Sequence, residues 1–264
     1  MKSITPRSIA AMKGAGKIAC LTAYDFRTAQ ILDDAGIPLI LVGDSLGTTL
    51  LGYDNTLPVT LQDMIRHTAA VVRGAKRALV VVDMPFMTYQ ASIEQALLAC
   101  GRVFQETGCQ AAKIEGGEFR APTIDALVRN GIPVLGHIGL TPQSVKVLGH
   151  RVQGRGDEAA RRLIADARAV EAAGAFAVVL EAVPAELGAA VSAAVRIPVI
   201  GIGAGPGCDG QILVINDILG LSGDFHPKFV KRYADLGAQI AAAAAAYRSD
   251  VETAAFPGPE HCYE

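Results

Sequence analysis

Short apolar runs recur along the chain, and several of them end in an ionisable side chain. Each run is long enough for a buried strand and too short for a helix, and the stretches between the runs have the character of helices. The runs are LILVGDS, LVVVDMP, AAKIEGG, VLGHIG and AVVLEAV, which carry Asp44, Asp83, Lys113, Glu115, His137 and Glu181. Strand and helix therefore alternate, which favours a parallel sheet with helical crossovers.

The pattern predicts the following elements. Strands are expected at 18–25, 38–45, 78–83, 110–115, 132–137, 176–181 and 197–203, with a weaker eighth near 217–221. Helices are expected at 26–35, 61–73, 92–107, 121–130, 157–173, 184–195 and 231–247. Gly-Ile-Pro or Arg-Ile-Pro triplets repeat at 36–38, 131–133 and 196–198, where one helix would end and the next strand begin.

We interpret this order as an α/β fold, a (β/α)8 TIM barrel. The length of 264 residues suits one such barrel, for which about 250 residues is typical. We expect one domain over 1–264, with a short helical lead-in over 1–17 and a C-terminal extension over 256–264.

Composition narrows the function classes. Hydrophobic residues make up 51% and charged residues 19%, which excludes a disordered chain. The net charge is −2 with no extended basic run, so we expect no nucleic-acid partner. No apolar stretch reaches about 18 residues and the N-terminus lacks an apolar signal core, so we expect neither a membrane span nor a secretory signal. The five scattered cysteines lack CxxC spacing, which favours a reducing cytoplasm over disulfides or a zinc site.

The carboxylates at the strand ends are the strongest candidates for chemistry. In parallel barrels the carboxyl ends of the strands carry the reactive groups. Asp44, Asp83 and Glu115 would then lie together, and clustered carboxylates repel one another unless a cation offsets their charge. Mg²⁺ takes oxygen ligands, so this set predicts a magnesium site. The alternative is that each acid is a helix cap or one half of an ion pair.

The other ionisable residues leave alternatives open. Lys113 and Glu115 are two apart on one strand and point to the same face, so Lys113 could complement a substrate anion or form an internal ion pair. His137 could be a ligand, an acid or a structural histidine. Glu181 follows an apolar run that should bury it partly and strengthen it as a base, although a salt bridge with Lys113 is the alternative.

Further residues at strand ends have weaker signals. GIGAG at 201–205 is compatible with a phosphate-binding loop or with close backbone packing. We expect Tyr24 and Tyr89 to line the mouth of the barrel. We interpret the remaining histidines of the first 230 residues as surface or loop residues: His67, His150 and His226.

Many separate motifs, in order and across nearly the whole chain, resemble the ketopantoate hydroxymethyltransferase family. They are TAYD (22–25), VGDSLG (42–47), TLPVT (56–60), DMPF (83–86), KIEGG (113–117), GHIGLTPQS (136–144), VQGRGDEA (152–159), LEAVP (180–184) and IGIGAGPGCDGQILV (200–214). One departure is VLGHRVQGR (147–155), which lacks the Gly-Gly-aromatic-Lys lead-in often seen before VQGR.

The resemblance implies a fold, an activity and an assembly. It implies a barrel of the phosphoenolpyruvate mutase/isocitrate lyase group. The implied activity transfers a hydroxymethyl group from 5,10-methylenetetrahydrofolate to 3-methyl-2-oxobutanoate, giving 2-dehydropantoate in pantothenate biosynthesis by way of a Mg²⁺-stabilised enolate. It also implies a homo-oligomer, often a decamer in the family.

The resemblance implies roles for individual residues as well. Asp44, Asp83 and Glu115 correspond to the magnesium-site acids, and Glu181 to the proton acceptor. The residues that correspond to contacts with the keto acid are Asp44, Ser45, Asp83 and Lys113, to which we add His137 as a candidate. Folate-contacting residues are not identified.

Two other functions compete with this one. A carbon–carbon lyase of the same barrel group would also use Mg²⁺ and an enolate, but those lyases resemble one another in a loop cysteine, for which this chain offers only Cys208. A non-catalytic barrel that binds a metal or metabolite would need no base beside the metal site.

Overall fold

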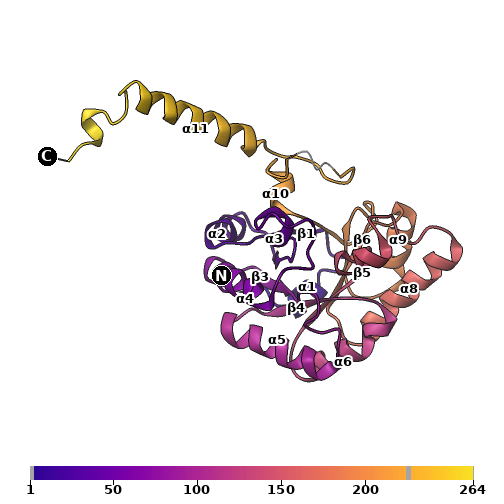
Figure 1. The fold of residues 1–264 in the computed structure, drawn as a ribbon. Coiled ribbons are helices and arrows are strands. Elements are labelled where there is room, and N and C mark those ends of the chain that lie inside the picture. Colours follow the sequence, from indigo (N-terminus) through magenta and orange to yellow (C-terminus); the bar gives the residue numbers. More distant parts are fainter. Residues whose placement is uncertain (1–2, 224–226, 264) are drawn as a thin grey trace. The chain divides into compact units, whose positions relative to one another are not determined.

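A computed structural model describes residues 3–223 and 227–263 of the chain. Within them, eight parallel strands close into a barrel in sequence order, each paired with the next and β8 with β1 (Figure 1). The strands are β1 (Ile18–Thr22), β2 (Leu39–Val42), β3 (Leu79–Asp83), β4 (Ala111–Glu115), β5 (Val134–Gly139), β6 (Ala177–Glu181), β7 (Val199–Ile202) and β8 (Gly210–Leu213). The (β/α)8 fold is confirmed.

Helices surround the barrel at the predicted places. The crossover helices are α2 (Phe26–Asp34), α4 (Leu61–Gly74), α5 (Ile93–Thr107), α6 (Ala121–Arg129), α8 (Asp157–Ala172) and α9 (Ala185–Ala194). Shorter pieces are α1 (Pro6–Ala10), α3 (Leu46–Thr49), η1 (Glu118–Arg120), η2 (Pro142–Ser144) and α7 (Val145–Leu148). Thr60 and Ser92 cap α4 and α5 through their side-chain oxygens, as their positions in the sequence predict.

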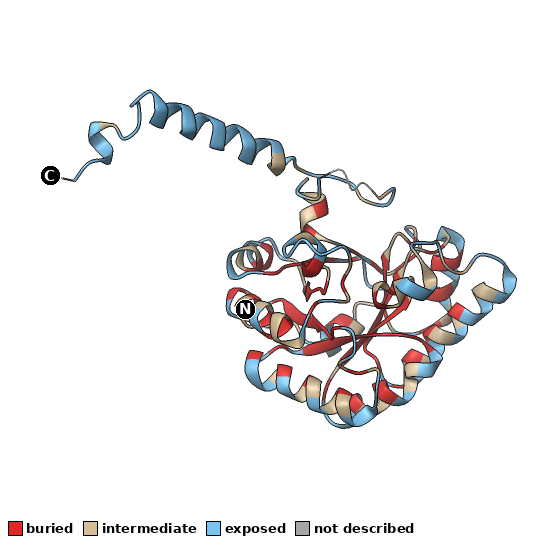
Figure 2. Cartoon of the chain, viewed as in Figure 1, coloured by how far each residue is buried: buried red, intermediate tan, exposed pale blue. Residues whose placement is uncertain are grey.

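Both faces of the strands are buried, which explains why they read as continuous apolar runs (Figure 2). Alternate residues face the barrel interior and form its core with Ile9 of α1. These interior residues are Ile18, Cys20, Leu39, Leu41, Leu79, Val81, Ala111, Leu135, Ala177, Val179, Ile200 and Ile212. The intervening residues, such as Ile40, Val80 and Ile114, are equally buried and lie on the other face of the strands, beneath the helices.

One strand prediction is wrong. The eighth strand was expected near 217–221, whereas β8 occupies Gly210–Leu213 and α10 (Ile215–Ile218) covers part of the expected stretch. β8 has an exposed Gln211 between buried Gly210 and Ile212, so its short half-polar sequence gives little apolar signal. The expected stretch contains Gly220, whose φ of 70° is incompatible with a strand.

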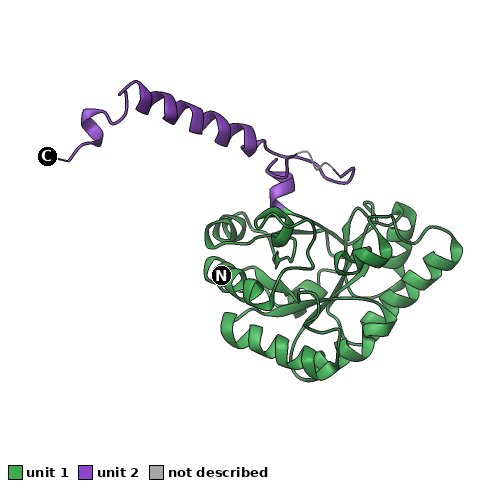
Figure 3. Cartoon of the chain, viewed as in Figure 1, with its two compact units in different colours: residues 1–214 green, residues 215–264 purple. Residues whose placement is uncertain are grey.

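The chain divides into two compact units, residues 1–214 and 215–264 (Figure 3). Unit 1 is the barrel. Unit 2 contains α10, α11 (Leu236–Glu252) and η3 (Pro259–His261), and no residue of α11 is buried. Within unit 2 the rings of Tyr247 and Phe256 meet edge to face, with centroids 5.7 Å apart. The expectation of one domain with a C-terminal extension stays a prediction.

Candidate active site

The ionisable residues of the strand ends face the interior of the barrel. Asp83 continues the inward alternation of Leu79 and Val81 on β3, and Glu181 continues that of Ala177 and Val179 on β6. Lys113 and Glu115 follow Ala111 on β4 in the same way, and His137 follows Leu135 on β5. The same period of two that builds the apolar core therefore places a polar layer above it, at the carboxyl ends.

Strand register brings these side chains together. Lys113 is the register partner of Asp83, and Glu115 that of His137. The Lys113 ammonium lies 2.6 Å from Asp83 Oδ1 and 3.7 Å from Glu115 Oε1. These residues are each at most 5% exposed. Lys113 therefore forms an internal ion pair, which was one of its two alternatives, and Asp83 is a closer partner than Glu115.

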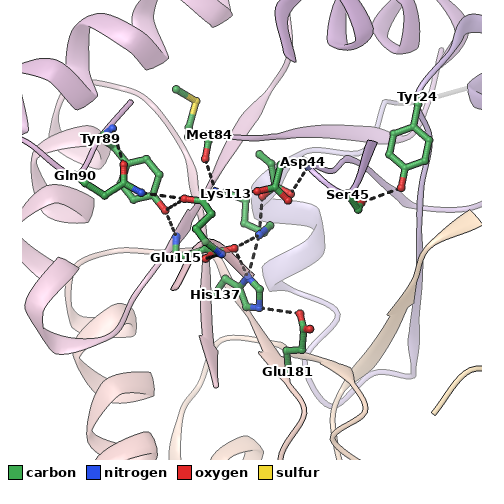
Figure 4. Close-up of polar contacts among 12 residues, drawn as sticks. Tyr24, Asp44, Ser45, Met84, Tyr89, Gln90, Lys113, Glu115, His137 and Glu181 are labelled. Carbon is green, nitrogen blue, oxygen red and sulfur yellow. Dashed lines mark hydrogen bonds and ion pairs between the residues drawn. The ribbon is translucent and has the colours of Figure 1, made fainter. Parts of the chain in front are cut away.

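Asp44 and Ser45 enter the site from the turn after β2. The Asp44 backbone N–H donates to Asp83 Oδ2 at 3.0 Å, which fixes the second oxygen of that carboxylate. Gly43 permits this approach, since a Cβ there would lie 2.6 Å from Ser45 Oγ and 3.5 Å from Asp83 Oδ2. Ser45 Oγ shares a hydrogen bond of 2.9 Å with the hydroxyl of Tyr24, which lies just after β1 (Figure 4).

His137 links the cluster to Glu181. Its Nδ1 lies 2.9 Å from the Lys113 ammonium, which can only donate, so Nδ1 accepts. The ring proton is then on Nε2, which lies 3.3 Å from Glu181 Oε2 (Figure 4). Glu181 is half-buried, as its apolar run predicts, with 17% of its side chain exposed. Its partner is His137 and not Lys113, which removes the alternative of a Glu181–Lys113 salt bridge among the contacts that the structure describes.

The local electrostatics are those of an excess of buried negative charge. Burial, together with the charges of Asp83 and Glu115, raises the pKa of Asp44 to about 8. Burial also raises the pKa of Asp83, although Lys113 opposes that shift. The surrounding carboxylates raise the pKa of Lys113 against the effect of its burial, which keeps it cationic. One ammonium thus faces three carboxyl groups, and a further cation would stabilise the ionised form of Asp44.

The donor set fits a hard divalent cation. Among the residues that the structure describes, no three His, Cys, Asp or Glu side chains already converge as a metal-ligand group. Mg²⁺ does not require one, because it is commonly held by one or two carboxylates with waters and substrate oxygens. Glu115 Oε1 is buried without a hydrogen-bond partner, and such an atom can accept a cation or a cation-bound water.

Sequence reasoning missed one residue of the site. Gln143 in η2 is buried, and its side-chain amide contacts Asp44 Oδ2 at 3.0 Å while its backbone N–H contacts Glu115 Oε2 at 3.1 Å. Tyr89, expected at the mouth, is 1% exposed and donates to the Gln143 amide oxygen at 2.7 Å. Gln143 lies within the GHIGLTPQS motif, so the motif itself was a signal for it.

Other candidates lie outside the site. The loop after β7 packs closely on α9, since a Cβ at Gly205 would lie 2.5 Å from Ala185 Cβ, which supports close packing as the role of the GIGAG glycines. The prediction that His67 is a surface or loop residue is wrong. His67 is half-buried in α4, and its ring Nδ1 forms a hydrogen bond of 2.6 Å with the Tyr24 carbonyl oxygen. His150 is exposed in a loop as expected, and His226 lies outside the described residues. Cys208 is fully buried just before β8, at the amino end of the barrel.

Comparison with known proteins identifies the family. The model of the family described as ketopantoate hydroxymethyltransferase matches residues 3–259. A 3-methyl-2-oxobutanoate hydroxymethyltransferase of Chloroflexus aurantiacus is 60% identical over 98% of this chain and 92% of its own length. One of Geotalea daltonii is 57% identical over 97% of each chain. The chain belongs to the ketopantoate hydroxymethyltransferase family.

Solved structures of other proteins have a similar barrel. The barrel is similar to that of 2,3-dimethylmalate lyase, described as a phosphoenolpyruvate mutase/isocitrate lyase superfamily member, with a TM-score of 0.63 at 17% identity over 98% of this chain and 90% of that one. Phosphonopyruvate hydrolase, solved with oxalate and Mg²⁺, gives a TM-score of 0.63 at 12% identity over 98% and 93%. At these identities the likeness shows the fold alone, a barrel like the one predicted.

Family membership makes this chain an enzyme, a hydroxymethyltransferase that fits the pantothenate pathway. The non-catalytic scaffold and the carbon–carbon lyase are therefore excluded as its activity. The residues that were expected to act in the site lie at the carboxyl end of the barrel, with Lys113 one layer deeper. Those at the carboxyl end are Asp44, Ser45, Asp83, Glu115, His137 and Glu181. Among the described residues, no helix is long and apolar enough to cross a membrane.

Proposed function

We propose that this chain transfers a hydroxymethyl group from 5,10-methylenetetrahydrofolate to 3-methyl-2-oxobutanoate. The products are 2-dehydropantoate and tetrahydrofolate, and water supplies the hydroxyl oxygen. The observation that carries the proposal is the half-buried Glu181 carboxylate, held by His137 beside a buried cluster of three carboxyl groups and one ammonium. That arrangement suits the removal of a proton next to a ketone, and family membership supplies the reaction in which such a step is needed.

The acids suit a resident Mg²⁺. Asp44 and Asp83 are the residues we propose to hold it, with Glu115 as a ligand directly or through water. When bound, the ion supplies Lewis acidity to the keto oxygen and stabilises the negative charge of the enolate. Burial, together with the charges of Asp83 and Glu115, raises the pKa of Asp44 to about 8, and a cation at this place would favour its ionised form.

Glu181 is the proposed base. Its carboxylate accepts the proton from C3 of the keto acid, and the C3 electron pair then forms the bond to the one-carbon unit of the folate. The Nε2–H of His137, 3.3 Å from Glu181 Oε2, orients the carboxylate and stabilises its charge before the proton arrives. Ala182, which follows Glu181, has a φ of 50°, so the backbone leaves strand geometry directly after the proposed base.

The keto acid itself carries a carboxylate that needs a counter-charge. Lys113 is the buried cation closest to the acids, and Ser45 offers a hydroxyl beside them. We propose that Lys113 and Ser45 bind the substrate, together with Asp44, Asp83 and His137. Lys113 then has two tasks, because it neutralises part of the acid cluster and complements the substrate anion.

The direct test is product formation with metal-stripped protein. With keto acid and 5,10-methylenetetrahydrofolate, mass spectrometry should detect 2-dehydropantoate after Mg²⁺ is added and at least about 10²-fold less before it, since Lewis-acid catalysis contributes several kcal/mol. Equal rates with and without the ion contradict the metal part of the proposal. No product under either condition contradicts the choice of substrates.

We also propose a homo-oligomer, a decamer by family resemblance, in a reducing cytoplasm. No residue of α11 is buried, and its Ile240 and Tyr247 are 59% and 61% exposed, so this helix offers apolar surface that a second copy could cover. All five cysteines are free. A sedimentation mass near 27.5 kDa across micromolar concentrations would contradict the oligomer.

A further inference from the structure

The side chain of Gln143 forms hydrogen bonds with four residues in and around the site. Its Nε2 group donates to Asp44 Oδ2 at 3.0 Å and to the Met84 carbonyl oxygen at 2.8 Å. Its Oε1 accepts from the Tyr89 hydroxyl at 2.7 Å and from Gln90 Nε2 at 2.9 Å. The amide therefore uses both hydrogens and both lone pairs while only 5% of the residue is exposed.

The surroundings allow this amide one orientation. The Met84 carbonyl group can only accept a hydrogen bond, so an amide turned by 180° would set its oxygen against that acceptor. The Tyr89 hydroxyl accepts from the Glu115 N–H at 3.2 Å, which leaves its own proton for Gln143 Oε1. The hydroxyl of the buried Tyr89 therefore holds the amide in this orientation (Figure 4 shows Tyr89, Gln90 and Glu115).

The consequence is that one residue fixes one oxygen of each of two acids. Asp44 Oδ2 receives the side-chain amide and Glu115 Oε2 receives the backbone N–H of Gln143. The other oxygen of Glu115, Oε1, is buried and forms no hydrogen bond, with the Lys113 ammonium at 3.7 Å and His137 Nδ1 at 3.5 Å. A neutral donor suits this task because it orients carboxylates without the competing charge that a second lysine would bring.

We propose that Gln143 is a positioning residue that orients Asp44 and Glu115 for cation binding, and that Tyr89 holds the Gln143 amide in its working orientation. The inference rests on the proposed function, in which these acids bind Mg²⁺. It adds a residue to which the family resemblance gave no role. Partners that orient metal ligands in this way typically change metal affinity by about 10- to 100-fold when removed.

The test measures Mn²⁺ binding to the metal-stripped protein through the electron paramagnetic resonance signal of free Mn²⁺, so it does not depend on turnover. Gln143→Met removes the amide and keeps the chain length, and it should weaken Mn²⁺ binding about 10- to 100-fold. Tyr89→Phe removes one hydroxyl and should weaken it about fivefold, because one net hydrogen bond of about 1 kcal/mol is lost.

The control is a glutamine at the opposite end of β4. Gln110 Oε1 accepts from the Val80 N–H at 2.8 Å near the amino end of the strand, so Gln110→Met removes an amide of the same kind far from the acids. It should bind Mn²⁺ as the unmodified protein does. If Gln143 has only a structural role, Gln143→Met lowers the melting temperature and leaves the Mn²⁺ affinity of the folded protein unchanged.

The outcomes separate the two proposals. Unmodified protein that binds Mn²⁺, with unchanged affinity in Gln143→Met and Tyr89→Phe, overturns the role of Gln143 and leaves the proposed metal site in place. If Gln143→Met does not fold, the Mn²⁺ affinity of Tyr89→Phe alone tests the role of Gln143, and an unchanged affinity overturns it. Unmodified protein that binds no Mn²⁺ overturns the metal site and this inference together.

Discussion

Two acids at opposite ends of the same barrel, Asp209 and Asp44, have pKa values shifted in opposite directions. At the amino end, Asp209 accepts from Lys13, from Ser192 Oγ and from the Val199 N–H, and these partners lower its pKa despite burial. At the carboxyl end, burial and repulsion from its acidic neighbours raise the pKa of Asp44 to about 8. Asp209 therefore has three donors, whereas the donor described for the Asp44 carboxyl group is the Gln143 amide. Glu115, also at the carboxyl end, resembles Asp209 in this respect, because His137 and Lys113 lower its pKa against the effect of burial.

Asp33 extends the comparison. At the amino end it accepts from the backbone N–H groups of Arg77 and Ala78 at 2.9 Å and 2.6 Å, and its pKa is lowered although the carboxyl group is buried. Such acids join the end of one helix or loop to the start of a strand and stabilise the fold. An acid with few donors, such as Asp44, destabilises the fold when ionised, and acids with strongly shifted pKa values cluster at functional sites.

The largest expected difference is in turnover. Asp44→Ala or Asp83→Ala removes a proposed cation ligand but little core, so each should lower Mg²⁺-dependent turnover at least about 10³-fold in a folded barrel. Asp209→Ala should keep kcat within about threefold and instead lower the free energy of unfolding by about 1–3 kcal/mol, because Lys13 loses its carboxylate partner. Steady-state kinetics and urea unfolding measure the two effects. Unchanged turnover and magnesium dependence in both site variants would remove these acids from the metal site.

Glu181→Gln tests the base within the carboxyl end. The change keeps the shape and removes the proton acceptor, so the proton-transfer step should slow by about 10²–10⁴-fold. Binding of Mg²⁺ and keto acid should survive, because the proposed ligands are on other strands. Calorimetric titration of the variant provides that control, and a variant that loses binding instead of rate would assign Glu181 to the substrate site.

The smallest expected effects are opposite pH dependences of stability in metal-free protein. The folded-state pKa of Asp44 is raised from 3.8 to about 8, so the folded protein loses stability as pH rises through that window. Asp44→Asn should therefore gain stability relative to the parent between pH 5 and 8, by about 1 kcal/mol or more, the equivalent of one pKa unit.

Asp209→Asn should show the reverse. The pKa of Asp209 is lowered in the folded state, so its stabilisation is present above the unfolded value of 3.8 and is lost as pH falls below it. The variant should be less stable than the parent near neutral pH and equal to it in strong acid. Thermal melts of both asparagine variants across the pH range check the pair, and curves of the same sign would remove the distinction between the two ends.

The sequence predicted the fold and the site to different depths. Most strands were found because residues such as Val81 and Val179 are buried on both sides of a parallel sheet and form unbroken apolar runs. β8 was missed because Gln211 interrupts it. Asp83, Glu115 and Glu181 were found because the inward alternation of a strand continues into its last residue.

Partnerships could not be predicted in the same way. Gln143 reaches Asp44 across 99 residues and Lys13 reaches Asp209 across 196, and no local period encodes such a contact. Whether Glu181 pairs with His137 or with Lys113 also depends on the strand register, which the closed barrel fixes. The sequence therefore predicted which residues lie at the strand ends, whereas their hydrogen-bond partners were found only in the structure.

The most direct test of the carboxyl end as a site of proton removal is deuterium exchange at C3 of 3-methyl-2-oxobutanoate in D₂O, without folate, followed by NMR. The parent protein with Mg²⁺ should exchange the C3 hydrogen, and Glu181→Gln with Mg²⁺ should do so about 10²–10⁴-fold more slowly. Asp209→Asn should exchange at the parent rate. Exchange by Glu181→Gln at the parent rate would assign the base to another residue, with His137 the first candidate, and absence of exchange in the parent would contradict proton removal at this site before the folate binds.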